Sequence, residues 1–271
     1  MQTMERQAVA PVHRKSRRPA PWPVEFYRSA VGKKWVMALT GIMLMGYVFV
    51  HMVGNLKVYL GADEINHYGE FLRELLVPLL PRTVTLWLLR LGLIAAFVFH
   101  IHAAYALTRL NRQARAEGGY VSPRDYQVAN AASRSMRMTG VVILLFLIWH
   151  LADLTWGTVN PGFERGDVYR NLVASFERPA VSAVYIVANV ALGLHLFHGG
   201  WSMFQSLGLN NPRWNSWRRG FAAGFAGVVM IGNLTFPIAV LTGIVSADDN
   251  PDCRVSDGTI ETCELYAEGE S

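Results

Sequence analysis

Histidines recur inside the apolar stretches of this sequence, where an ionisable side chain is costly and usually marks function. A neutral imidazole is the commonest metal ligand in proteins, and two of them on opposite sides can hold a haem iron. A lone histidine of this kind can instead hydrogen-bond to a neighbouring helix. Because four separate apolar stretches each carry at least one, we favour the ligand interpretation. The residues are His51, His100, His102, His150, His195 and His198.

The apolar stretches that carry these histidines are long enough to cross a bilayer, which takes about 20 helical residues. The chain of 271 residues is 52% hydrophobic and only 17% charged, and most of its charges lie between the apolar stretches. This pattern predicts an all-α membrane protein, a bundle of five transmembrane helices over residues 34–246 in the cell (inner) membrane. The predicted spans are 36–57, 84–108, 138–157, 181–204 and 221–246.

The segments between the spans alternate in charge, which predicts their sides of the membrane. Residues 1–36, 109–137 and 205–219 together carry 17 Lys and Arg against 4 Asp and Glu. Residues 57–83, 157–180 and 247–271 carry 7 against 15. The positive-inside rule therefore places the N-terminus in the cytoplasm and the C-terminus outside. Because the basic residues flank membrane spans, we expect no nucleic-acid binding.

The two ends of the chain differ from the bundle in composition. Residues 1–33 form a basic cytoplasmic segment that we expect to be largely disordered, and residues 247–271 form an acidic extracytoplasmic tail. Cys253 and Cys263 lie in this tail, where a disulfide and two free thiols are both open. Residues 61–80 read as an amphipathic helix on the outer surface.

Depth in the membrane sorts the histidines, since each residue of a helix rises about 1.5 Å. Measured from the cytoplasmic edge, His51 lies at about 23 Å and His150 at about 18 Å. His195 lies at about 13 Å and His102 at about 8 Å. An outer and an inner pair result, each drawn from two helices, and two b haems held by them would link the two membrane faces.

Small residues surround His195 on its face of the helix, which would let a porphyrin approach closely or two helices pack. They are Ala188, Ala191, Gly199 and Ser202, and the histidine at their centre favours the haem. His198, at the edge of this stripe, could contact a haem propionate or a quinone, or bond a neighbouring helix. Small residues flank both His100 and His102, so this criterion does not choose between them.

Together these features resemble the di-haem cytochrome b membrane-anchor subunit of succinate:menaquinone oxidoreductases and related fumarate reductases. The similarity spans roughly residues 30–245 and is carried by four stretches: "HMVGNLKVYLG" at 51–61, "HAAYAL" at 102–107, "WHLADLTW" at 149–156 and "HLFHGGWSMFQSLG" at 195–208. The resemblance implies that His102 and His195 bind the inner haem and that His51 and His150 bind the outer one. The His-Ala-x-Tyr match at 102–105 is the reason for choosing His102.

The same resemblance implies a function and partners. The chain would carry electrons from the iron–sulfur subunit of succinate dehydrogenase through the haems to menaquinone, with no dehydrogenase site and no catalytic residue of its own. The flavoprotein and iron–sulfur subunits would dock on the basic loops at the cytoplasmic face, and an additional small membrane subunit is compatible with this assembly.

Three further charged residues are candidates for the haem or quinone sites. Arg90 would hold a haem propionate, and Asp153 or Glu70 would handle quinone protons. The simpler alternative is an ion pair between Arg90 and Asp153.

Two other functions fit the histidines less well. One is a cytochrome b subunit of another quinone-linked enzyme, of the formate dehydrogenase or hydrogenase type, which its electron donor would reveal. The other is a transporter whose histidines relay protons or bind a metal, against which the sequence shows no inverted repeat.

Overall fold

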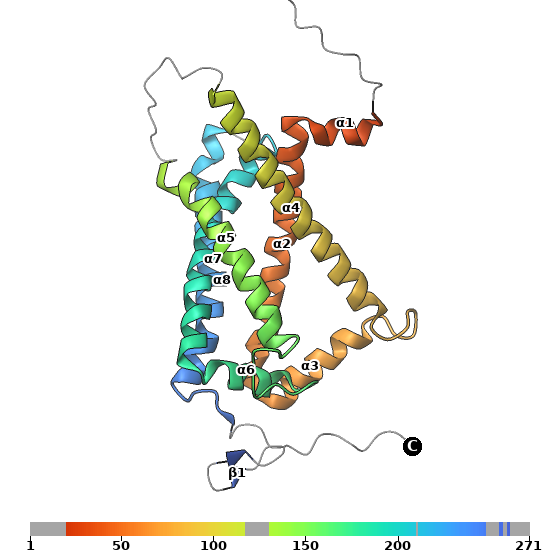
Figure 1. The fold of residues 1–271 in the computed structure, drawn as a ribbon, viewed down its shortest axis with the longest axis vertical. Helices are drawn as coiled ribbons and strands as arrows, with labels where there is room; N and C mark the ends of the chain where they lie inside the picture. The colour runs from red at the N-terminus through yellow and green to blue at the C-terminus, as the bar shows by residue number, and fades with distance from the viewer. Residues whose placement is uncertain (1–19, 117–129, 210, 248–254, 257–258, 261–271) are drawn as a thin grey trace, which may run out of the picture.

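Helices make up most of the part of the chain that the structure describes. The computed structural model describes residues 20–116, 130–209, 211–247, 255–256 and 259–260. Among these residues, five helices are long and apolar enough to cross a membrane, which confirms the predicted all-α bundle (Figure 1). They are α2 (Ala30–Asn55), α4 (Val84–Ala116), α5 (Asn130–Leu154), α7 (Pro179–Ser206) and α8 (Asn215–Leu241).

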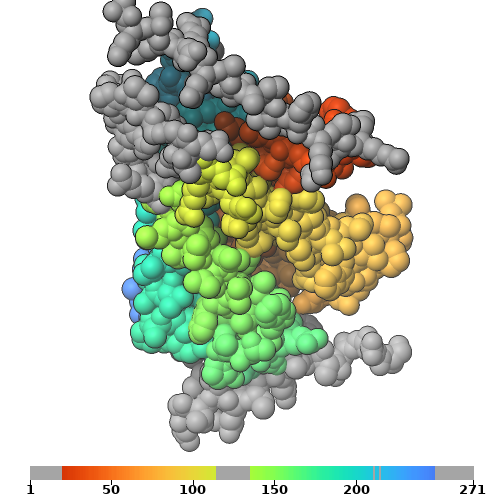
Figure 2. All heavy atoms as spheres, turned by 45° about the horizontal axis from the view of Figure 1, so that its top comes forward, coloured from red at the N-terminus to blue at the C-terminus, as the bar shows by residue number. Residues whose placement is uncertain are grey.

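The long helices form two groups that meet at α2. Helix α4 packs against α2, whereas α7 packs against both α5 and α8. Helix α2 also contacts α7 and α8, so it joins α4 to the other group. Figure 2 shows a hollow in the surface between α4 and α5, with α2 behind it.

Close helix packing depends on glycines that face methionines. A Cβ atom at Gly193 of α7 would lie 2.8 Å from the Sδ of Met230 on α8, and one at Gly232 of α8 would overlap Met52 on α2. Without water to drive apolar surfaces together, membrane helices associate through this kind of close backbone approach.

The N-terminal segment is more ordered than we expected. Helix α1 (Trp22–Arg28) runs across the end of α2, and α2 itself begins at Ala30, after Ser29 caps it by accepting from the Gly32 N–H at 2.9 Å (Figure 1). Trp22 and Phe26 of α1 are exposed, as in a helix that lies in a membrane interface. Residues 22–28 and 30–33 are therefore helical, which differs from the expectation of a largely disordered segment through residue 33.

The opposite end of the bundle is closed by short helices. They are the 3₁₀-helix η1 (Leu56–Leu60), α3 (Ala62–Glu74), which lies within the predicted surface helix, and α6 (Val168–Phe176), which we did not predict. Asn66 of α3 joins the two, since its Oδ1 accepts from the backbone N–H of Val168 at 2.8 Å and of Tyr169 at 3.1 Å. Buried apolar residues from α3, α6, α7 and α8 form one core beneath this cap.

Short elements complete the described chain. The 3₁₀-helix η2 (Pro212–Trp214) precedes α8, and in the acidic tail β1 (Val255–Ser256) pairs antiparallel with β2 (Thr259–Ile260). Cys253 and Cys263 lie outside the described residues, so their pairing stays a prediction.

Candidate functional site

Two imidazole rings face each other in the part of the bundle nearer α1. They belong to His100 of α4 and His195 of α7, with ring centroids 6.5 Å apart and ring planes at 63°. We call them the inner pair, following the predicted orientation. Each ring is fixed at Nδ1, which lies 3.2 Å from the Oγ1 of Thr40 for His100 and 3.2 Å from the Oγ1 of Thr139 for His195.

A second pair lies nearer α3 and α6. His51 of α2 and His150 of α5 have ring centroids 5.9 Å apart, and their planes are nearly perpendicular at 88°. Tyr47 stacks on His51 and Phe146 packs against His150, each from one turn earlier in the same helix. The structure thus brings together the two residues expected at the outer level, and we call them the outer pair.

His102 is not part of either pair, contrary to our expectation. Its side chain is exposed, its Nδ1 is hydrogen-bonded to the hydroxyl of Tyr27 on α1, and the two rings stack at 5.7 Å. Partial burial raises the pKa of Tyr27, so its hydroxyl stays neutral in this contact. The predicted opposition of His102 and His195 is therefore wrong, because α4 turns His100 and not His102 toward α2 and α7.

The spacing within each pair suits an iron between the rings. A metal–imidazole bond of about 2 Å, with the ring centre about 1 Å beyond the nitrogen, places two axial rings about 6 Å apart. Both observed separations are close to this value. Among the residues that the structure describes, no three or more His, Cys, Asp and Glu side chains are grouped to hold a metal ion. Pairs suffice for a haem, whose porphyrin supplies the other four nitrogens.

The two pairs lie at different levels of the bundle. His100 packs beside Thr40 and Gly41 of α2, and His51 follows Thr40 by eleven residues on that helix. On α5, Thr139 and His150 have the same separation. Each interval corresponds to about 16 Å along the helix, so the two pairs are stacked along the bundle.

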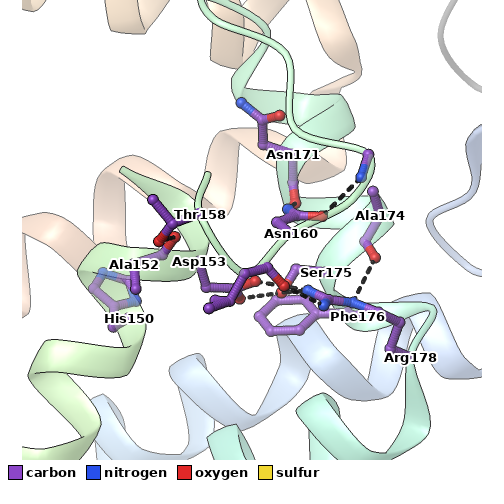
Figure 3. Close-up of polar contacts among 12 residues, drawn as sticks. His150, Ala152, Asp153, Thr158, Asn160, Asn171, Ala174, Ser175, Phe176 and Arg178 are labelled. Atoms are coloured by element: carbon purple, nitrogen blue, oxygen red, sulfur yellow. Dashed lines mark hydrogen bonds and ion pairs between the residues drawn. The ribbon is translucent and has the colours of Figure 1, made fainter. Parts of the chain in front are cut away.

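The outer pair is connected to a buried carboxylate. Asp153 is fully buried, one turn after His150, and its Oδ1 accepts from Arg178 Nη2 at 2.6 Å (Figure 3). Its Oδ2 accepts from the hydroxyl of Tyr185 at 2.9 Å and from that of Ser175. The Tyr185 oxygen also lies 3.4 Å from the Nδ1 of His150, so it links the imidazole to the carboxylate.

One comparison with known proteins gives a match. Residues 114–234 match the model of the family described as succinate dehydrogenase/fumarate reductase transmembrane subunit. Over these residues, which are less than half of the chain, the sequence is similar to this family. In the other comparisons, no curated protein and no solved structure matched the chain.

The match covers one histidine of each pair. The matched residues include α5, α6, α7 and most of α8, and therefore His150 and His195, while α2 and almost all of α4 lie outside it. By that description, proteins of this family are transmembrane subunits of succinate dehydrogenase or fumarate reductase.

The remaining charged candidates have other partners than expected. Arg90 is exposed on α4 and lies over the Trp87 ring at 5.1 Å, so the alternative of an Arg90–Asp153 ion pair is wrong. Glu70 of α3 forms ion pairs with Arg73 and, at 2.5 Å, with Arg82. Sequence reasoning missed Arg178, the partner of Asp153, because it lies outside every predicted span.

Polar atoms without partners lie near the histidine pairs. Within the described part of the chain, the buried His198 Nδ1 and Trp201 Nε1 accept or donate no hydrogen bond, and neither does Trp149 Nε1 beside His150. A Cβ atom at Gly199, one turn after His195, would meet nothing within 4 Å. The carboxylate side chains of a porphyrin would accept hydrogen bonds from such free donors, and the open backbone at Gly199 would let its ring approach.

Proposed function

We propose that this chain is the cytochrome b anchor of succinate dehydrogenase, which carries electrons from the iron–sulfur subunit to menaquinone and binds two b haems. The observation that carries this proposal is the presence of two opposed imidazole pairs, at 6.5 Å and 5.9 Å, stacked along one bundle. When bound, each haem would supply a one-electron carrier in an apolar medium.

At the inner level, the chain's own residues fix the ligands and offer polar contacts. His100 and His195 would be the axial ligands, since the bonds at Nδ1 leave each Nε2 available. His198 follows His195 by one turn, and its free Nδ1 suits a haem propionate better than a third ligand position. His102 instead holds α1 against α4 through Tyr27.

At the outer level, the ligands would be His51 and His150. Tyr185 can accept from the Nδ1–H of His150 while it donates to Asp153, and this chain of bonds holds the imidazole in the form that binds a metal through Nε2. Arg178 neutralises the buried carboxylate, so the network carries no net charge.

The quinone would be reduced near the outer level, where protons are exchanged. Of the two predicted carboxylates, Asp153 is fully buried, and its oxygens already accept hydrogen bonds from Arg178, Ser175 and Tyr185. This favours a structural role for Asp153 over proton exchange. The Glu70 side chain is 43% exposed, so we assign proton exchange with menaquinone to Glu70. Arg90, exposed on α4 and without a carboxylate partner among the ion pairs of the described residues, is free for a haem propionate.

The partners would bind at the end of the bundle that carries α1. The described basic residues of segments 109–137 and 205–219, at the ends of α4, α5 and α8, lie at this end (Figure 1), so the flavoprotein and iron–sulfur subunits would dock there, on the cytoplasmic face. The acidic end with α3 and α6 would then face outward.

The purified complex tests this proposal. Addition of succinate should reduce a b-type haem in the visible spectrum, and a menaquinone analogue should reoxidise it. Reduction by formate or hydrogen but not by succinate would favour the other type of cytochrome, and a preparation without any haem band would contradict the proposal and favour a transporter.

A further inference from the structure

The two inner histidines have the same surroundings, built by different helices. The His100 Nδ1 lies 3.1 Å from the Met37 carbonyl oxygen and 3.2 Å from Thr40 Oγ1, both on α2. The His195 Nδ1 lies 3.2 Å from Thr139 Oγ1 on α5, and the ring also interacts with the backbone of Met136 on that helix. A partner on the next helix therefore holds each ring at the same atom.

A glycine completes each copy of this arrangement. A Cβ atom at Gly41 would lie 3.4 Å from the Cε1 of His100, and one at Gly140 would lie 3.6 Å from the Cε1 of His195. In both places, the absence of a side chain lets the ring rest against the backbone of the facing helix.

The sequence repeats with this geometry. Residues 37–41 read Met-Ala-Leu-Thr-Gly and residues 136–140 read Met-Arg-Met-Thr-Gly, and an outer histidine follows each threonine by eleven residues. An aromatic residue, Tyr47 or Phe146, also precedes each outer histidine by one turn. The α2–α4 and α5–α7 pairs are thus two copies of one unit, a parallel repeat.

The threonines fix which ring nitrogen carries the proton. Thr40 Oγ1 donates to the Val36 carbonyl at 2.6 Å, and Thr139 Oγ1 donates to the Ser135 carbonyl at 2.9 Å. Each hydroxyl hydrogen is thereby engaged, so the oxygen offers only a lone pair to the imidazole. The Met37 carbonyl beside His100 is also an acceptor, which favours the tautomer of His100 with the hydrogen on Nδ1 and an unprotonated Nε2. Thr139 favours the same tautomer of His195.

We propose that Met37, Thr40 and Gly41 on α2 and Met136, Thr139 and Gly140 on α5 form a duplicated cradle that sets the reduction potential of the inner haem. This inference rests on the proposed function. An acceptor at Nδ1–H makes the imidazole a stronger electron donor, which stabilises the oxidised iron and lowers the potential. Because the cradle acts on both axial ligands, its two halves act on one iron and their effects add.

Redox titration of the purified complex, with the spectrum of each haem followed separately, tests the cradle. The variants are Thr40→Val, Thr139→Val and the double variant. Each single variant should raise the ratio of reduced to oxidised inner haem at a fixed potential roughly fivefold, the effect of one net hydrogen bond. The double variant should show about the product of the two shifts, and the outer haem should not change.

Matched variants separate positioning from general packing. Thr108→Val, on α4, removes a hydroxyl that bonds only its own helix at the Ala104 carbonyl, and should leave both potentials unchanged. Thr40→Ser and Thr139→Ser keep the hydroxyl and should restore the parental potential, and also any inner haem that a valine variant loses. Three results would overturn the inference. The reduction potentials could stay unchanged in all valine variants, or Thr108→Val could shift them equally. The third is a loss of haem in a valine variant that the serine variant does not repair. A parental complex without two haems would instead refute the proposed function.

Discussion

Asp153 and Arg178 form an ion pair, with 2.6 Å between Oδ1 and Nη2, at the point where α7 begins. The carboxylate is fully buried, whereas the Arg178 side chain is 29% exposed. Arg178 also donates to the Val159 carbonyl at 2.7 Å, so it ties the loop after α5 to the start of α7. This contact positions the helix that carries Tyr185 and His195.

Asp153→Asn should destabilise the subunit, because it removes the charge that compensates Arg178 in a buried site. We expect a loss of about 2–3 kcal/mol, at the lower end for a broken buried pair since Arg178 is partly exposed. The measurement is the temperature at which the purified complex loses its haem band. As a control, Glu74→Gln breaks the exposed contact with Arg82 at 3.6 Å and should cost less than about 1 kcal/mol. Equal thermal stability of Asp153→Asn and the parent would show that the pair has no stabilising role.

Tyr185→Phe should change the reduction potential of the outer haem alone. The substitution removes the acceptor for His150 Nδ1–H and one donor to Asp153, so the imidazole becomes a weaker electron donor and the outer potential rises. The expected effect is of the order of one hydrogen bond, ~1 kcal/mol. Redox titration gives the shift, and Tyr59→Phe, which changes a tyrosine stacked on Phe236, is the control. A shift in the potential of the inner haem, or no shift in either potential, would contradict the assigned connection between Tyr185 and the outer haem.

Asn66→Ala should loosen the cap over the outer end of the bundle. The change leaves the backbone N–H groups of Val168 and Tyr169 without their acceptor at the start of α6. Loss of such a cap costs about 1 kcal/mol. Hydrogen exchange at residues 168–176 should become faster, while the midpoints of α4 and α7 keep their protection. Unchanged exchange in α6 would mean that Asp167, whose Oδ1 accepts from the Arg170 N–H at 2.9 Å, is a sufficient cap.

Hydropathy predicted the five spans because a bilayer imposes length and apolar composition on each helix by itself. Helix α6 has only nine residues and was not predicted, although Asp167 as a cap before apolar residues was a usable signal. Helix α1 was hidden by its position in a basic, proline-rich segment. These short helices depend on contacts with the bundle, which local patterns do not contain.

The choice between His100 and His102 shows where the sequence stops being sufficient. Residues two apart point about 200° apart on a helix, so only the neighbouring helices decide which one faces inward. Two signals were nevertheless present. His100 lies about 3 Å closer than His102 to the predicted depth of His195. The repeated Met-x-x-Thr-Gly pattern places an equivalent cradle on α2 and α5, and it is His100 that occupies the one on α2.

Haem quantified per chain in the purified complex tests the central claim, that opposed histidines from different helices bind one haem at each of two levels. The parent should hold two b haems, His100→Ala should hold one, and His102→Ala, changed at an exposed ring bonded to Tyr27, should hold two. One haem in His102→Ala together with two in His100→Ala would restore the other assignment on α4. Fewer than two haems in the parent would contradict the account as a whole.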